Sequence, residues 1–544
     1  MPKWISLLCL LAFQISAFSQ EPTEQKAPNV EIPNVDACIP PWVAAAKKPS
    51  LFPFHNGLVI AIIAENQNAQ IHTLQGLNHL HAGWDFEAIR HFAVAMQADP
   101  RCLMAHWGMI MSMLGTSPET DSYRLAATQR LLELVADGEG TELERGFAYC
   151  LIKYVEEGSK GAGIAFRKVS DRFPKDIQSE IFAILFSRGG YDLTGEITAT
   201  QAEAEKNLDR LIQRVPNNAL PLHAYLLVKA EAPNLKPSIQ LAKKLCEIAP
   251  NYPPYLHLLG HYQWRSGFFD EAITSFSLAE KYYTEWMTSN KIKYADCPQL
   301  ILTKSYLAVA KASAGNFPDA IAAATELSKI PLDPKRPTSL GNRQILWDAQ
   351  TLPARIIMHC GGKNDPTEAL LSLPKPLENQ AFHKHSLSRW WTDGVRITLQ
   401  ARRLLNVGDI KTAAETIDAL SFHGEAMIKQ KDAASARGEY AQWRRALLDL
   451  EMLNANLRGH LALAGPKESQ GSAFNWFRAA ADRQRASTLI HPPLILSPMA
   501  NDLGDYYVSI HQPQKALAAY QEAILKFPNE ASALKRIEKV KATE

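Results

Sequence analysis

A spacing of small and aromatic residues near the N-terminus is the feature that most constrains the fold of this chain. Gly76, Gly83, Ala88, Phe92 and Ala95 follow one another at steps of 7, 5, 4 and 3, and a proline five residues later ends the stretch. Small residues allow two antiparallel helices to approach closely, the aromatic fills the space between them, and proline cannot continue a helical hydrogen-bond ladder. Such a hairpin cannot bury its apolar face alone, so it requires similar neighbours.

The same spacing recurs along the chain, which predicts a series of stacked helical hairpins. The strong copies are Gly260, Gly267, Ala272, Phe276 and Ala279 in the middle, and Gly504, His511, Ala516, Tyr520, Ala523 and Pro528 near the end. Weaker copies are Ala308, Gly315, Ala320, Ala324 and Leu327, followed by Ala401, Gly408, Ala413, Ile417 and Leu420.

This pattern resembles the tetratricopeptide repeat family, whose period is about 34 residues. Residues 99–108 (DPRCLMAHWG), 456–465 (NLRGHLALAG) and 516–529 (ALAAYQEAILKFPN) look like segments of long, exported bacterial members of that family. The resemblance implies an all-α fold, a right-handed α-α superhelix of roughly ten to twelve helical hairpins. It implies a curved binding surface and no particular reaction.

Helical periodicity and turn residues place the individual helices. Besides the hairpin around 77–100, the predicted helices span 101–114, 122–135, 142–156, 164–173, 177–187, 199–215, 255–267, 270–281, 344–358, 383–406, 409–420, 437–463, 473–485 and 531–541. Proline-rich joints at 331–337 and 373–376 are expected to be longer loops between hairpins, and the helix at 344–358 between them is expected to be interrupted or bounded at Pro353.

The first residues are typical of a secretory signal peptide. Lys3 precedes a short apolar run, and Ala17, Phe18 and Ser19 precede Gln20, so we expect cleavage after Ser19 and an exported, periplasmic or extracellular chain. The alternative, acylation of Cys9 as in a lipoprotein, would leave almost no apolar segment in front of the cysteine. No later run has the ~20 apolar residues of a membrane helix.

Composition then divides the rest of the chain. Residues 1–19 are the predicted signal peptide, 20–37 a polar, proline-containing tether without structure, and 38–66 a capping segment over the first open face. Residues 67–330 form the predicted N-terminal array. Residues 331–544, where the periodicity is looser, form the predicted C-terminal array with a polar capping helix at its end.

Charge and cysteine content exclude some functions. With 58 basic and 56 acidic residues, the formal charge of +2 provides no strong field for nucleic acid. Six cysteines follow the signal peptide, isolated from one another, and we expect mostly free, buried thiols with at most one or two disulfide bridges. They are Cys38, Cys102, Cys150, Cys246, Cys297 and Cys360.

Three histidines form the best candidate site. In such arrays the first helix of each hairpin lines the concave surface through repeat positions 2, 5, 9 and 12, with the small residue at position 8. His257 and His261 then hold positions 5 and 9 of one helix, and His223 holds position 5 of the preceding repeat. Imidazoles at i and i+4 suit one divalent transition metal. The alternative is that they contact a bound peptide or hydrogen-bond to neighbours, and no general base accompanies them.

A Met- and Trp-containing helix and a histidine-rich stretch near the N-terminus each allow a functional and a structural interpretation. Met104, Trp107 and Met111 hold positions 2, 5 and 9 of their helix, so they are expected either to grip a peptide or to form core under the capping segment. A histidine-rich stretch contains His55, His72, His79, His81, His91 and His106. For these six we expect ordinary packing and surface exposure.

These observations favour a non-catalytic scaffold that binds a peptide or protein partner in its concave groove and needs no cofactor. A metal-binding protein or metal-dependent hydrolase using His223, His257 and His261 is the second hypothesis. A structural subunit of an envelope assembly is the third. No phosphate-binding loop or nucleophile motif is present in the sequence.

Overall fold

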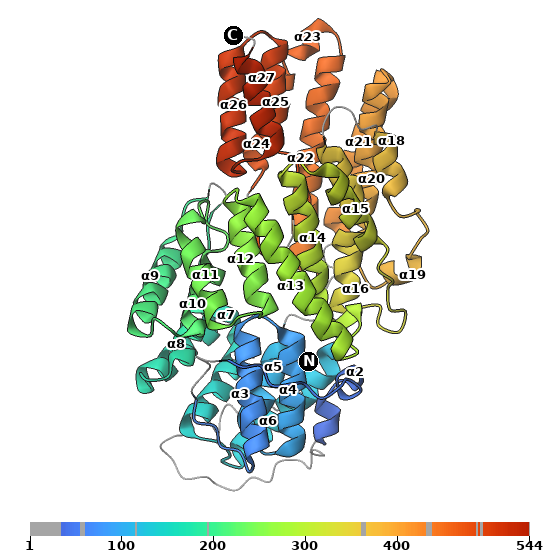
Figure 1. The fold of residues 1–544 in the computed structure, drawn as a ribbon. Helices are drawn as coiled ribbons and strands as arrows, with labels where there is room; N and C mark the ends of the chain where they lie inside the picture. The colour runs from blue at the N-terminus through green and yellow to red at the C-terminus, as the bar shows by residue number, and fades with distance from the viewer. Residues whose placement is uncertain are drawn as a thin grey trace.

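The protein is a chain of α-helices that pack in pairs, as a computed structural model shows (Figure 1). The structure describes residues 34–54, 60–114, 117–192, 195–360, 366–430, 438–485, 488–489 and 493–542. The predicted signal peptide, most of the predicted tether and His55 lie outside these residues. None of the described helices is both long and apolar enough to span a bilayer.

Eleven hairpins follow one another in the described residues, which confirms the predicted all-α solenoid of ten to twelve hairpins. They are α3 (Gln67–His81) with α4 (Asp85–Ala98), α5 (Leu103–Ser112) with α6 (Asp121–Ala136), the two arms of α7 (Glu142–Arg172), α8 (Ile177–Ser187) with α9 (Ala199–Arg214), α10 (Ala219–Lys229) with α11 (Ile239–Ile248), α12 (Pro253–Arg265) with α13 (Phe269–Ser289), α14 (Pro298–Ser313) with α15 (Phe317–Ser328), α17 (Leu352–His359) with α18 (Pro366–Ser372), α20 (Ser388–Asn406) with α21 (Ile410–Gln430), α22 (Tyr440–Ala464) with α24 (Ala473–Arg483), and α25 (Met499–Ser509) with α26 (Pro513–Lys526).

Shorter elements connect or cover these hairpins, and α27 (Ala531–Lys541) follows the last of them. The connecting elements are η1 (Val35–Cys38), α2 (Pro41–Ala44), η2 (Pro118–Thr120), η3 (Lys236–Ser238), η4 (Tyr294–Asp296), α16 (Leu340–Gln344), the π-helical turn η5 (Ile345–Ala349), α19 (Gln380–His383) and α23 (Lys467–Gln470).

The repeat motif works through contact of a glycine with an aromatic ring. A Cβ added to Gly76 would lie 2.6 Å from the ring of Phe92, and one added to Gly260 would lie 2.8 Å from Phe276. The glycine therefore lets the second helix of the hairpin approach until its aromatic side chain lies against the backbone of the first. Glycine also supplies the turn, since Gly267 has a φ of 80°, in the left-handed region.

One predicted turn lies inside a longer element. The sequence predicts helices at 142–156 and 164–173, and the structure has α7 across both. Gly158, in the predicted turn, has φ 70° and ψ −160°, so it breaks the helix into two arms. Phe147 of the first arm and Phe166 of the second stack edge to face with ring centroids 5.4 Å apart. The pair is thus a hairpin in packing, although the helical assignment is continuous.

The N-terminal segment packs onto the first hairpins. Cys38, Val43 and Ile62 are buried in the same apolar cluster as α4 and α5. The side chain of Gln75 accepts a hydrogen bond from the backbone N–H of Phe52 at 3.1 Å and donates one to its carbonyl at 2.8 Å. Residues 34–38 also belong to this packed segment, because η1 contacts α4 and α6, so the last residues of the predicted tether are part of the fold.

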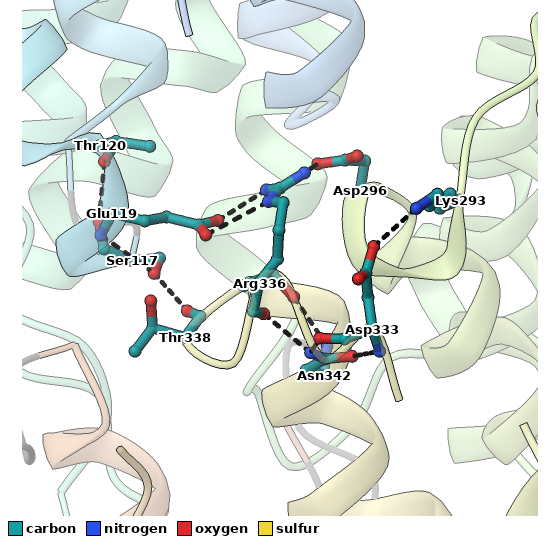
Figure 2. A network of polar contacts seen from close by, with 10 residues as sticks. Ser117, Glu119, Thr120, Lys293, Asp296, Asp333, Arg336, Thr338 and Asn342 are labelled. Carbon is teal, nitrogen blue, oxygen red and sulfur yellow. Dashed lines mark hydrogen bonds and ion pairs between the residues drawn. The ribbon is translucent and has the colours of Figure 1, made fainter. Parts of the chain in front are cut away.

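Arg336 joins segments from three parts of the chain (Figure 2). Its guanidinium donates to Glu119 of η2 at 2.6 Å and 3.2 Å and to Asp296 of η4 at 2.6 Å. It also lies over the ring of Trp42, 3.9 Å from the centroid. The side-chain amide of Asn342 donates to the carbonyl of Arg336 at 2.7 Å, which holds the proline-rich loop in place. The loop therefore bridges the segments before and after residue 330.

The superhelix closes onto itself in its N-terminal half. The first hairpin contacts α10 and α13 as well as its sequence neighbours, and Trp84 packs against Trp286 with ring centroids 4.9 Å apart. Arg90 donates to the side chain of Asn290 at 2.8 Å, across 200 residues of sequence. Figure 1 shows α3 and α4 directly below α12 and α13. The concave side of this half is consequently filled by the protein itself.

Candidate functional site

His257 and His261 are buried in the middle of the chain rather than exposed on a concave wall. Nδ1 of His257 lies 3.0 Å from Oγ1 of Thr303 on α14, and the ring of His261 packs edge-on against Tyr306 of the same helix. Burial lowers the pKa of His257 to about 3, and burial with the charge of Arg265 holds the pKa of His261 well below its usual value. Both imidazoles are therefore neutral at physiological pH.

His223 faces a different part of the molecule. Its ring lies against Tyr255, with centroids 5.4 Å apart. Burial and the charge of His81 on α3 lower its pKa to about 4, and α10, which carries His223, packs against α3 of the first hairpin. Closure of the superhelix thus places α3 where a free groove was predicted.

The predicted metal site at His223, His257 and His261 is therefore not assembled in this structure. Among the described residues, the group of three whose ligand atoms all lie within 4.8 Å of one another is His79, Glu87 and His91. The reason is tertiary, because helices from other repeats occupy the space in front of the predicted face. Leu496, from the segment before α25, packs in one cluster with Trp264 and Tyr306 and covers this wall further.

Met104, Trp107 and Met111 take the second of the two roles expected for them. Met104 and Trp107 are fully buried, and only Met111 is partly exposed. The indole N–H of Trp107 donates to the carbonyl of Phe147 at 3.0 Å, and its ring packs edge-on against Phe147 and Phe182. Met104 and Trp107 therefore form core and present no surface for a peptide.

The open concave surface lies in the C-terminal half, where a cavity of about 590 Å³ is lined by helices from the last four hairpins and by α27. Its volume lies in the range typical of ligand pockets. The apolar lining includes Pro366, Ala369, Trp391, Val395, Leu399, Leu405, Leu453, Leu463, Leu494, Ile495, Leu496 and Pro498. The polar lining includes Arg355, His359, Arg402, Asn406, His460, Asn501, Asp502, Asp505, Ser532 and Arg536.

The lining follows the concave positions of the repeats. Gly459 and Gly504 each face an aromatic ring of the next helix, Phe477 and Tyr520, as Gly260 faces Phe276, so they hold position 8. With Ala401 as the third such residue, positions 2, 5, 9 and 12 supply much of the cavity wall. These residues are Val395, Arg402 and Leu405, then Leu453, His460 and Leu463, then Pro498, Asn501 and Asp505. The spacing of positions 2, 5, 9 and 12 around the small residue at position 8 is therefore a sequence signal for these cavity residues.

Asp502 is held as a carboxylate at the base of the polar wall. Its Oδ2 accepts from the Asn456 amide at 2.7 Å, and its Oδ1 lies 3.7 Å from Nε2 of His460. Burial alone would raise its pKa, but His460, Arg402 and Asn456 outweigh this effect and hold the pKa well below its usual value. A carboxylate so stabilised is a fixed negative charge, which will not act as a proton donor near neutral pH.

Of the other charged side chains in the cavity, some have hydrogen-bond partners and one has none among the described residues. Arg536 donates to both oxygens of Asp505 at 3.0 and 3.1 Å, and Tyr520 donates to Asp505 at 2.7 Å. In contrast, no hydrogen bond or ion pair within 4.0 Å joins the guanidinium of Arg402 to any other described side chain. Its positive charge acts on Asp502 at longer range and helps to lower the pKa of that carboxyl. Its five N–H donors are therefore open to solvent or a ligand in the cavity.

Comparisons with known proteins give only a general likeness. The sequence matches no protein-family model, and a search of curated proteins found no similar sequence. Among solved structures, the chain is similar to the TPR domain of P58(IPK) at 13% identity, covering 87% of this chain and 98% of that one, with a TM-score of 0.21. Yeast Tom70 gives 10% identity, coverage of 88% and 90%, and a TM-score of 0.27. The human IFIT1 dimer with m7Gppp-AAAA gives 12% identity, coverage of 89% of this chain and 96% of that one, and a TM-score of 0.37. The TPR-like fold of this chain rests on its own hairpins, and these likenesses say nothing of its ligand.

Proposed function

We propose that this chain is an exported, non-catalytic scaffold that binds an extended peptide segment of a partner protein in the C-terminal cavity. The observation that carries the proposal is that the concave positions of three successive C-terminal repeats converge on one open cavity, whereas the equivalent N-terminal positions are buried. Extended concave surfaces of repeat proteins are their usual binding surfaces.

The lining indicates what kind of peptide fits. Leu405, Leu463 and their apolar neighbours would bury one or more large aliphatic or aromatic side chains. The open donors of Arg402 suit a carboxylate, because a guanidinium and a carboxylate can form two parallel charge-assisted hydrogen bonds. The partner segment is therefore expected to combine an apolar side chain with an acidic group, supplied by Asp, Glu or a chain terminus.

The polar groups of the cavity support binding rather than catalysis. Asp502 and Asp505 are each paired and hydrogen-bonded, so neither is poised as a general base. Six free cysteines, four of them buried, offer no reactive thiol here, and burial raises the pKa of the Cys360 thiol to about 11.

Selection from a displayed library of short random peptides tests the proposal. We expect enriched peptides to carry an acidic group and a large apolar residue, and Arg402→Glu to weaken their binding by about tenfold or more, since it removes one partner of a charge pair. Arg403→Glu is the matched control, because Arg403 is exposed on the same helix and lies outside the cavity. Amidated and free-acid forms of each peptide distinguish a terminal carboxylate from a side chain.

Two outcomes would contradict this function. One is the absence of any enriched peptide, and the other is equal binding by the Arg402→Glu and Arg403→Glu variants. Light scattering separates a scaffold from an envelope subunit, since the latter would form large assemblies by itself. Export is tested separately: the N-terminal residue of the mature protein is expected to be Gln20.

A further inference from the structure

The first hairpin brings four ionisable side chains together in its interior. His72 and His79 lie seven residues apart on α3, and Glu87 and His91 lie four apart on α4, so each pair shares one face of its helix. All four are buried, with exposed fractions between 0 and 4%. Charged or polar groups at such depth require partners, since an unpaired buried polar atom costs about 1 to 3 kcal/mol.

Three of these side chains converge, and two of them have a ring nitrogen without a hydrogen-bond partner among the described residues. One ligand atom each of His79, Glu87 and His91 lies within 4.8 Å of the other two. Nε2 of His91 is 3.9 Å from Oε1 of Glu87, too far for a hydrogen bond. Within the described structure, the Nε2 atoms of both His79 and His91 are buried and have no hydrogen-bond partner.

The opposite nitrogen of each ring is already held. Nδ1 of His79 lies 2.8 Å from the hydroxyl of Tyr252, and Nδ1 of His91 lies 2.8 Å from Nδ1 of His72. The other oxygen of Glu87 accepts a hydrogen bond from Arg90. In protein metal sites, ligating imidazoles and carboxylates are oriented in this way by hydrogen bonds from their far side.

The protonation states also suit ligation. Burial and the charge of Arg90 lower the pKa of His79 to about 3, and burial with the neighbouring histidines holds the pKa of His91 well below its usual value. Burial raises the pKa of Glu87, an effect that Arg90 opposes. Both rings are therefore neutral, and Nε2 carries the lone pair that a metal ligand needs in the tautomer whose proton is on Nδ1, facing Tyr252 or His72.

We propose that His79, Glu87 and His91 together bind one divalent transition-metal ion, with zinc as the best fit. Two imidazole nitrogens and one carboxylate oxygen form a ligand set that suits zinc, and a water molecule would complete the coordination. The two unpartnered nitrogens would then be satisfied by one ion. The site differs from the cavity in place and in role, and does not depend on the proposed function.

The position of the site indicates a structural role. Tyr252 is the residue before α12, 173 residues from His79, and Phe54 of the N-terminal segment packs on the His79 ring at 5.3 Å. An ion held here would link α3 and α4 to each other and, through Tyr252, to the hairpin that closes the superhelix. Since aromatic side chains cover it, we expect the ion to enter during folding and to resist removal by chelators afterwards.

Metal analysis of the full chain tests the proposal. Expressed with zinc or cobalt in the medium, the protein should retain about one equivalent of metal, and less than about a tenth of an equivalent would overturn the proposal. Glu87→Gln and His91→Gln should lower retention at least tenfold, and Tyr252→Phe should weaken it by about 10- to 100-fold through loss of the outer hydrogen bond. His257→Gln is the matched control, because His257 is also buried with an unpartnered Nε2 but belongs to no group of three ligand side chains among the described residues.

A second measurement on the unaltered protein keeps the test decisive if a variant fails to fold. X-ray absorption at the edge of the bound metal should show only nitrogen and oxygen ligands, with the scattering pattern of about two imidazoles. Sulfur ligation would contradict the proposal, since it would place the metal at cysteines. Retention of the metal by folded Glu87→Gln and His91→Gln variants would contradict it equally.

Discussion

The side-chain amide of Asn529 donates a hydrogen bond to the backbone carbonyl of Gly267 at 3.2 Å, across 262 residues of sequence. Asn529 lies in the turn between α26 and α27, and Gly267 lies in the turn between α12 and α13. The approach is close, since a Cβ at Gly267 would lie 2.6 Å from the carbonyl oxygen of Pro528. The last hairpin therefore docks on the middle of the chain rather than extending away from it.

This contact predicts a difference between two substitutions of Asn529, whose φ of 60° is left-handed. Asn529→Ala loses the hydrogen bond and adds backbone strain of about 1 to 2 kcal/mol, whereas Asn529→Gly loses only the hydrogen bond. Amide hydrogen exchange in residues 525–532 should be faster in the alanine variant than in the glycine variant. Equal exchange in the two would show that the left-handed turn does not matter for docking.

The contact of Gly260 with Phe276 predicts that a single methyl group disrupts a hairpin. Gly260→Ala places a Cβ 2.8 Å from the ring, and overpacking of this kind costs about 1 to 3 kcal/mol of unfolding free energy. Gly424→Ala is the control, because nothing lies within 4 Å of the added Cβ in α21, and it should stabilise the protein by about 0.5 to 1 kcal/mol. Urea unfolding followed by circular dichroism measures both, and a stabilising Gly260→Ala would refute the packing argument.

The Arg336 network predicts a large effect from one side chain in a loop. Arg336→Ala leaves Glu119 and Asp296 without their common partner and should cost about 3 kcal/mol, the lower end of what is lost when one member of a buried ion pair is removed, because these side chains are largely but not fully buried. Lys335→Ala, at an exposed neighbour, should change stability by no more than about 0.5 kcal/mol. Similar urea midpoints for the two variants would contradict a bridging role for the loop.

Burial of neutral histidines predicts that stability falls in acid. The pKa of His257 is lowered from 6.5 to about 3, so between these pH values the unfolded chain binds a proton that the native chain does not. The free energy of unfolding should therefore decrease as pH falls from 6.5 towards 3. Above pH 6.5 the contribution of His257 to that free energy should remain constant.

Two variants separate this linkage from general destabilisation. His257→Gln should show a shallower dependence of unfolding free energy on pH within that window, because the titrating group is gone. Thr303→Ala removes the hydrogen-bond partner of His257 but keeps the imidazole, so its dependence on pH should remain close to that of the wild type. An unchanged slope in His257→Gln would be incompatible with a neutral, buried imidazole.

Much of the local structure was predictable, because helix ends and hairpin turns depend on residues close in sequence. The helices predicted at 177–187 and 531–541 coincide with α8 and α27, and the break between the helices predicted at 142–156 and 164–173 contains the left-handed Gly158. The helix predicted at 344–358, interrupted or bounded at Pro353, is divided into the end of α16, η5 and α17. Pro353 lies in the first turn of α17, where a missing N–H costs nothing, so it marks a start rather than an interruption.

For the candidate sites, the sequence could predict only which residues share one face of one helix. Positions 2, 5, 9 and 12 identify the inner face of each hairpin, in the N-terminal half as in the C-terminal half. In the first half that face is covered, by α14 over His257 and by α3 near His223. The convergence of His79 with His91 was not expected, because a spacing along the chain does not show how two antiparallel helices are aligned.

By itself, the sequence determined that helices form in pairs, where each pair turns, and which side of each pair faces inwards, since glycine, proline and aromatic spacing act within about 34 residues. Only the tertiary structure decided which inner faces remain open. That outcome depends on the curvature summed over many hairpins, which brings Trp84 to Trp286 and Asn529 to Gly267. Small rotations at each interface accumulate, so no single repeat records where the superhelix closes and where it leaves a cavity.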